Sequence, residues 1–110
     1  MRQIVALMLV ISSALFGKFA YAEPDQLQKL LQKNNCLACH LIDKRKYGPK
    51  LKEVAEKYSG KAGAADKLAK KIKAGGTGVW GEDIMPPQPQ VSDAEAKLIA
   101  EMILALQQEQ

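Results

Sequence analysis

Apolar residues recur at intervals of three and four positions along much of the chain, which is the spacing of one face of an α-helix. Four segments show this pattern: residues 25–33, 51–58, 64–73 and 93–106. No segment alternates apolar and polar residues for long enough to predict a strand. The pattern therefore predicts a small all-α domain of about four short helices.

The residues around these segments agree with this prediction. Asp25 with Gln28, and Ser92 with Glu95, have the spacing of capping boxes at helix starts. Between the last two helices, residues 75–91 contain four glycines and three prolines. Such a stretch cannot sustain a helix, because proline removes a backbone donor and glycine gives the backbone too much freedom. We therefore expect a long loop there.

The first 22 residues have the form of a secretory signal peptide, which we expect to be cleaved after Ala22. A basic start at Arg2 precedes an apolar stretch, and Ala20-Tyr21-Ala22 gives a small-x-small end. The alternative is a membrane anchor. Lys18 interrupts the apolar run, which is short of the roughly 20 residues that a membrane span requires. The sequence thus predicts a mature domain, residues 23–110, that is exported to the periplasm without stable membrane insertion.

This mature domain is small for a self-sufficient core, so a disulfide, a metal or a cofactor is expected to complete it. The chain has only two cysteines, Cys36 and Cys39, and a bond between them would close too small a ring to join distant segments. A disulfide framework is therefore disfavoured, which leaves a metal or a cofactor.

Positive charge is concentrated in two places. The net charge of +4 falls to +2 when residues 1–22 are removed, since Arg2 and Lys18 leave with no acidic residue. The basic residues cluster in two groups: Lys44, Arg45, Lys46, Lys50 and Lys52, and then Lys67, Lys70, Lys71 and Lys73. An exported chain rarely meets nucleic acid, so these groups form either a solvated surface or a docking site for an acidic partner protein.

The segment Cys36-Leu37-Ala38-Cys39-His40 carries the strongest chemical signal, because Cys-x-x-Cys-His is the attachment signature of c-type haem. Two thiols three positions apart can each form a thioether to one haem vinyl group, and the following imidazole can reach the iron. A zinc site would need four ligands, and the chain has a single histidine. A dithiol redox pair would need a βαβ context, which the pattern lacks.

A second axial ligand to the iron is expected from Met85. His40 is the only histidine, and Met102 lies on the apolar face of the last helical segment. Met85 lies in the helix-free loop before Pro86-Pro87, where the prolines reduce the entropy lost on ordering. A His40/Met85 pair would favour Fe(II) and fill both axial positions, which indicates an electron carrier. The alternative is a haem protein with a labile Met85 that acts as a sensor or an enzyme.

Taken together, the motifs of the mature chain resemble those of the small bacterial class I c-type cytochromes of the cytochrome c-551/c-552 group. The resemblance covers residues 23–107 and rests on four motifs, at residues 36–40, 47–49, 78–81 and 85–88. It implies a class I cytochrome c fold around one covalently bound haem c. The first and last helices would cross, with Leu30 and Leu31 buried against Leu98, Met102 and Ile103.

The resemblance also implies roles for individual residues. Cys36 and Cys39 would carry the thioethers, and His40 and Met85 would be the axial ligands. The carbonyl of Pro49 would accept the ring N–H of the axial histidine, and Trp80 would donate its indole N–H to a haem propionate. Where many relatives have an arginine near a propionate, this chain has Lys71, and where they often have asparagine after Met-Pro-Pro it has Gln88.

The function implied is that of a periplasmic, monomeric, non-enzymatic carrier of single electrons. Its partners would be redox proteins such as a terminal reductase, an oxidase or a photosynthetic reaction centre. We expect an exposed haem edge ringed by Lys44, Lys46 and Lys71 to be the docking surface. Such transient encounters rely on small interfaces and electrostatic steering.

Overall fold

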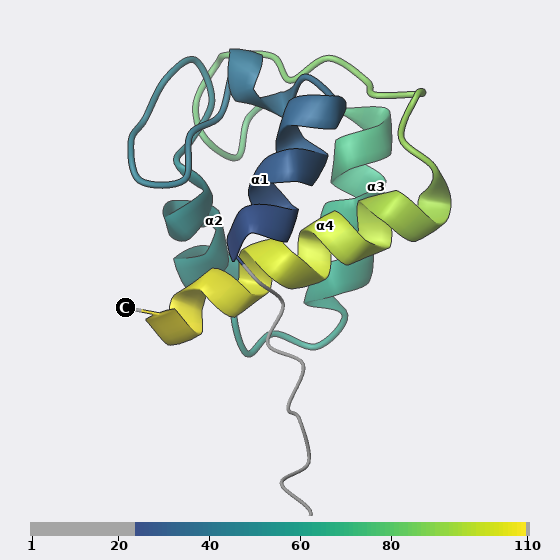
Figure 1. Cartoon of the computed structure of the whole chain (residues 1–110). Coiled ribbons are helices and arrows are strands. Elements are labelled where there is room, and N and C mark those ends of the chain that lie inside the picture. The colour runs from purple at the N-terminus through teal and green to yellow at the C-terminus, as the bar shows by residue number, and fades with distance from the viewer. Residues whose placement is uncertain (1–23, 110) are drawn as a thin grey trace, which may run out of the picture.

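The computed structural model describes residues 24–109 of the chain (Figure 1). It contains four α-helices: α1 (Pro24–Lys33), α2 (Leu51–Tyr58), α3 (Ala64–Ala74) and α4 (Asp93–Ala105). Two short 3-10 helices are η1 (Cys36–Ala38) and η2 (Leu106–Glu109). Within residues 24–109 the β-type pairing consists of an isolated bridge between Gly76 and Met85. The predicted all-α fold is confirmed, whereas the predicted signal peptide lies outside the described residues.

The structure supports one half of one predicted capping box, the cap by Ser92, and not the other box. Helix α1 begins at Pro24, so Asp25 lies inside its first turn and the prediction that it caps the helix is wrong. Proline suits the first position of a helix, because an N–H at that position would have no acceptor within the helix and proline has none to satisfy. Ser92 does cap α4, since its hydroxyl accepts the N–H of Glu95 at 3.1 Å. The Glu95 carboxylate does not accept the backbone N–H of Ser92, as a full capping box requires. It accepts hydrogen bonds from Asn34 and Lys33 instead.

Helix α4 is the centre of the core: α1, α2 and α3 all contact it, and α1 and α3 cross it (Figure 1). The inner face of α1 consists of Leu27 and Leu31, which are buried, while Leu30 is only partly buried. Met102 and Ile103 are buried as predicted. The prediction for Leu98 is wrong, because its side chain is 37% exposed. The inner face of α4 is centred one position further along, on Ile99 and Ile103.

Two segments without α-helix lie together at one end of the helices, at the top of Figure 1. The attachment segment, residues 34–50, contains η1 and joins α1 to α2. The methionine loop, residues 75–91, joins α3 to α4 and contains no helix, as its glycines and prolines predict. Within residues 24–109 no helix combines the length and the apolar character needed to cross a membrane.

Candidate functional site

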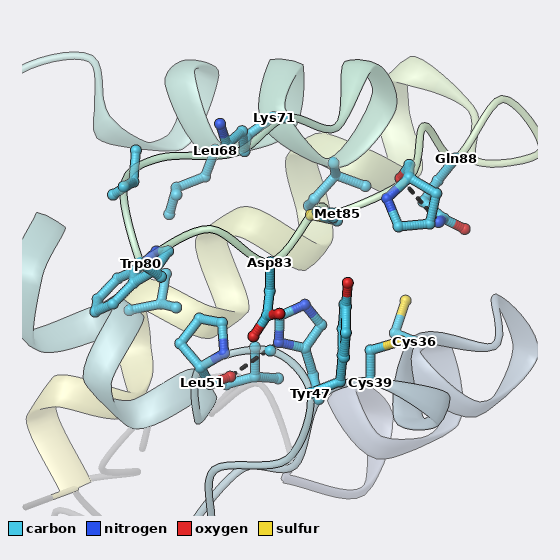
Figure 2. Close-up of a pocket in the computed structure, with 18 of the residues that line it drawn as sticks. Cys36, Cys39, Tyr47, Leu51, Leu68, Lys71, Trp80, Asp83, Met85 and Gln88 are labelled. Atoms are coloured by element: carbon cyan, nitrogen blue, oxygen red, sulfur yellow. Dashed lines mark hydrogen bonds between the residues drawn. The ribbon is translucent and has the colours of Figure 1, made fainter.

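A cavity opens between the attachment segment, the methionine loop and helices α1 to α4 (Figure 2). Its walls are largely apolar and include side chains that belong to the core of the protein: Leu31, Leu51, Leu68, Ile99 and Ile103. Cys36, Cys39 and His40 line it from the attachment segment, and Met85 lines it from the methionine loop. The fold thus brings together the four residues in which the sequence predicts haem chemistry.

The two cysteines reach the cavity from the tight turn of η1. Asn35 adopts a left-handed conformation with φ 60°, which lets the chain turn sharply between α1 and η1. The backbone N–H groups of Cys39 and His40 then both donate to the carbonyl of Cys36, at 3.2 and 2.9 Å. Both thiols are free and half-buried, and burial raises the pKa of the Cys36 thiol above its usual value. The turn therefore presents both sulfurs and the imidazole to one cavity.

The imidazole of His40 is held in one orientation by a backbone carbonyl. Its Nδ1 lies 2.9 Å from the carbonyl oxygen of Pro49, as the resemblance implies. A carbonyl can only accept, so Nδ1 carries a proton, and Nε2 is the ring nitrogen left to bind a metal. Gly48 makes room for the ring, because a Cβ at that position would lie 2.5 Å from His40 Cε1. Nothing in the sequence assigns this role to Gly48, although it stands directly before Pro49.

Met85 is fixed to the end of α3 by a two-way backbone pairing. The N–H of Met85 donates to the carbonyl of Gly76 at 2.8 Å, and the N–H of Gly76 donates back at 2.9 Å. Gly75 allows this close approach, since a Cβ there would lie 2.3 Å from the Met85 carbonyl oxygen. The glycines that end α3 thus also position the methionine.

The charged residues that line the cavity are Arg45, Lys71 and Asp83. Lys71 reaches it from α3, with its Nζ lying against Gly76, but neither Lys44 nor Lys46 lines it. Lys46 instead donates to the carbonyl of Leu37 at 3.2 Å. Asp83 was missed by the sequence analysis, because nothing in the loop sequence distinguishes it from a solvated carboxylate.

Trp80 and Gln88 make contacts that the sequence did not predict. Trp80 lines the cavity, its carbonyl accepts from Arg45 at 3.2 Å, and the ammonium of Lys57 lies 5.4 Å from its ring centre. The Gln88 amide donates to the carbonyl of Pro86 at 3.1 Å and accepts from Gln90 at 2.7 Å. The side-chain hydrogen bonds of Gln88 therefore stay within the methionine loop, while its backbone N–H donates to the carbonyl of Lys73 in α3 at 3.1 Å.

Comparison with known proteins agrees with this geometry. The family model described as Cytochrome c matches residues 26–107. Cytochrome c-552 of Nitrosomonas europaea is 48% identical over 95 residues, which are 86% of this chain and 88% of the relative. Cytochrome c-551 of Stutzerimonas stutzeri is 45% identical over 106 residues, which are 96% of this chain and 99% of the relative.

A solved structure gives the same result for the fold. The crystal structure of wild-type Nitrosomonas europaea cytochrome c552 matches with a TM-score of 0.71 at 51% identity, covering 73% of this chain and 99% of that one. The chain therefore belongs to the cytochrome c family. Within that family it is a class I c-type cytochrome with the all-α fold, similar to the c-551 and c-552 proteins.

Membership of this family defines the cofactor as one covalently bound haem c, and the chain as an electron-transport protein. The residues present fit that group. Two free thiols lie at the haem-attachment spacing, the histidine ring is oriented through Nδ1 by the Pro49 carbonyl, and the cavity walls are largely apolar. A cofactor in this cavity would complete the core, as expected for a domain of this size.

Proposed function

We propose that the chain is a periplasmic monohaem cytochrome that shuttles single electrons between redox proteins, with His40 and Met85 as axial ligands. The observation that carries the proposal is that both residues line one cavity from separate segments. Cys36 and Cys39 would hold the haem covalently from the same turn that presents His40.

Each residue has a distinct part in this function. Bound haem supplies a one-electron Fe(III)/Fe(II) couple. The bond from His40 Nδ1 to Pro49 orients the imidazole and raises its basicity. The soft thioether of Met85 favours Fe(II) and raises the reduction potential. If His40 and Met85 both bind the iron, no position would remain open to substrate, so the proposed role is electron transfer and not catalysis.

The proposed location and partners rest on the sequence and on charge. The signal-like residues 1–22 support export to the periplasm. Lys71 at the cavity, with Lys44 and Lys46 on the attachment segment, supports docking of a monomer to acidic surfaces of redox proteins. Raising the ionic strength should then slow electron transfer to an acidic partner, and a rate independent of salt would contradict such steering.

The test begins with the protein expressed with its own leader in a host that attaches c-type haem. Intact mass and a pyridine haemochrome assay should give one haem per chain, and the mature N-terminus should be Glu23. The oxidised protein should show the weak far-red band of methionine–iron ligation. A mass without added haem would contradict the proposal.

A matched pair of variants tests the axial ligand. Met85→Ala should abolish the far-red band and lower the reduction potential. Met102→Leu should retain both, because Met102 is 6% exposed in the core of α4 and does not line the cavity. If wild-type protein lacks the band and binds cyanide or carbon monoxide rapidly, the labile-ligand sensor or enzyme becomes the better reading.

A further inference from the structure

The attachment segment and the methionine loop carry the two proposed axial ligands, so their relative position decides where the ligands lie. Met85 is tied to α3 through Gly76, and His40 is tied to the attachment segment through Pro49. Neither contact joins the two segments to each other. Something else must therefore keep Met85 in place relative to His40.

Three hydrogen bonds join these two segments in the part of the chain that the structure describes. Arg45 donates to the carbonyl of Trp80, and the Tyr47 hydroxyl accepts from the N–H of Ile84, both at exposed positions. The third is partly buried: the side-chain amide of Gln90 donates to the backbone carbonyl of Asn34 at 3.3 Å. A hydrogen bond shielded from water is electrostatically stronger than an exposed one.

The Gln90 contact is one link of a longer chain of hydrogen bonds. The Gln90 amide nitrogen also donates to Gln88 Oε1 at 2.7 Å, and Gln88 Nε2 donates to the carbonyl of Pro86 at 3.1 Å. Both ends of the chain are backbone carbonyls, which can only accept, so the orientation of both amides is fixed. The chain thus runs from Asn34, two residues before Cys36, to Pro86, directly after Met85.

The Asn34 end of this chain is firmly anchored. Asn34 is 5% exposed, and its amide donates to the carbonyl of Leu30 at 2.9 Å and to the carboxylate of Glu95. Its carbonyl also lies 3.9 Å from Cys36 Sγ. Through Asn34, the Gln90 contact therefore connects the methionine loop to α1, to α4 and to the first haem-attachment cysteine.

We propose that Gln90 is a positioning residue that holds Met85 in register with the haem-attachment turn, and so determines how long its sulfur stays bound to the iron. The proposal rests on the axial ligation proposed above. Without the Gln90 amide, the loop keeps its bonds to α3 but loses its partly buried bond to the attachment segment. Met85 should then leave the iron more often.

The experiment measures the rate at which cyanide displaces Met85 in the oxidised holoprotein, followed as loss of the far-red band at saturating cyanide. Gln90→Leu keeps the volume and removes both donors. We expect displacement about tenfold faster, which is the factor for losing two ordinary hydrogen bonds of about 0.7 kcal/mol each. Gln26→Leu, the same change at an exposed position on α1, should leave the rate unchanged.

Further variants separate positioning from general stability. Gln90→Lys restores a donor and should recover most of the wild-type rate. Lys97→Ala, which removes the ion pair with Asp66 between α4 and α3, should lower the free energy of unfolding without accelerating displacement. A Gln90→Leu rate equal to wild type would overturn the positioning role while leaving the ligation intact. A wild-type protein without the far-red band would overturn the ligation and the positioning role with it.

Discussion

The phenolic oxygen of Tyr47 accepts a hydrogen bond from the backbone N–H of Ile84 at 3.3 Å. This bond joins the attachment segment to the methionine loop one residue before Met85. Tyr47 also lines the cavity while 49% of its surface stays exposed. The ring therefore covers part of the open side of the cavity and holds its two edges together.

Tyr47→Phe tests the contribution of this bond to stability. The ring would remain, but the N–H of Ile84 would lose its partner. Because the site is exposed, water replaces part of the bond, and we expect the free energy of unfolding to fall by about 0.5 kcal/mol. Guanidinium unfolding of the holoprotein measures this. Tyr58→Phe is the control, since it removes a hydroxyl but retains the ring that faces Lys61 and Lys67. If both variants lost the same free energy of unfolding, the contact between Tyr47 and the methionine loop would not be the cause.

Gly48→Ala tests the close packing of the backbone on the imidazole. Its Cβ would lie 2.5 Å from His40 Cε1, so the ring or the backbone must shift. We expect a loss of about 1–3 kcal/mol in stability, as for other overpacked sites, together with a changed reduction potential. Gly60→Ala is the control, because it has open space around it and a positive φ of 77°. It should cost about 1 kcal/mol from backbone strain and leave the potential unchanged.

Lys71 and Asp83 carry opposite charges and line the same cavity. Removing each charge in turn should therefore shift the reduction potential in opposite directions. Lys71→Gln removes a positive charge that stabilises Fe(II), and should lower the reduction potential. Asp83→Asn removes a negative charge and should raise it. Each shift should be a few tens of millivolts, the size expected for a unit charge roughly 10 Å from the iron in a medium of intermediate dielectric. Voltammetry that gave shifts of the same sign would exclude a simple charge effect.

Acid should destabilise the protein partly through Glu95. The Asn34 amide first, and the Lys33 ammonium second, hold the pKa of Glu95 below its usual value. A carboxylate with a lowered folded pKa stabilises the fold above its unfolded pKa of about 4.3, and loses that contribution as the pH falls through the lower folded value. Stability should therefore decline as the pH falls below about 4.3. Lys97 and Lys73 lower the pKa of Asp66 and Asp93 in the same sense.

Glu95→Gln isolates this contribution, because the new side chain keeps an acceptor for Asn34 but does not titrate. Its free energy of unfolding should fall less steeply with acid than that of the parent. High salt should remove the Lys33 part of the difference and leave the Asn34 part, since salt screens the exposed charge pair. Parallel pH curves for the two proteins would contradict this assignment.

The sequence was a good guide where local chemistry decides the structure, and a poor one where packing decides it. The bounds of α2 and the helix-free loop follow from periodicity, glycine and proline, and the structure confirms both. Leu98 was misplaced because it shares a helical stripe with Ile99, and only contact with α1 and α3 shows which residue faces inward.

The contacts that position the site residues could not be predicted from the sequence either. Cys36, His40 and Met85 could be named from motifs, but the pairing of Gln90 with Asn34 spans 56 positions and has no local signature. Gly48 had no assigned role because its purpose is visible only with the His40 ring beside it. Residues that do the chemistry were therefore easier to predict than residues that position them.

The cavity predicts that the fold depends on its cofactor. Several apolar side chains of the core line it, among them Leu51, Leu68, Ile99 and Ile103. An empty apolar cavity costs about 24 cal/mol per Å³, so this cavity of about 150 Å³ would cost about 4 kcal/mol, and a small domain has only about 5–15 kcal/mol of stability in all. Leaving the cavity without its cofactor would therefore remove a large part of that margin.

A double variant, Cys36→Ala with Cys39→Ala, should therefore yield a haem-free chain with most of its helical circular dichroism lost. Cys39→Ala alone keeps one thiol for attachment and should retain the helical signal once haem is bound. Intact mass establishes which chains carry haem before the spectra are compared. A native-like helix signal in the haem-free double variant would show that the four helices pack without the cofactor, and would refute the dependence argued from the cavity walls.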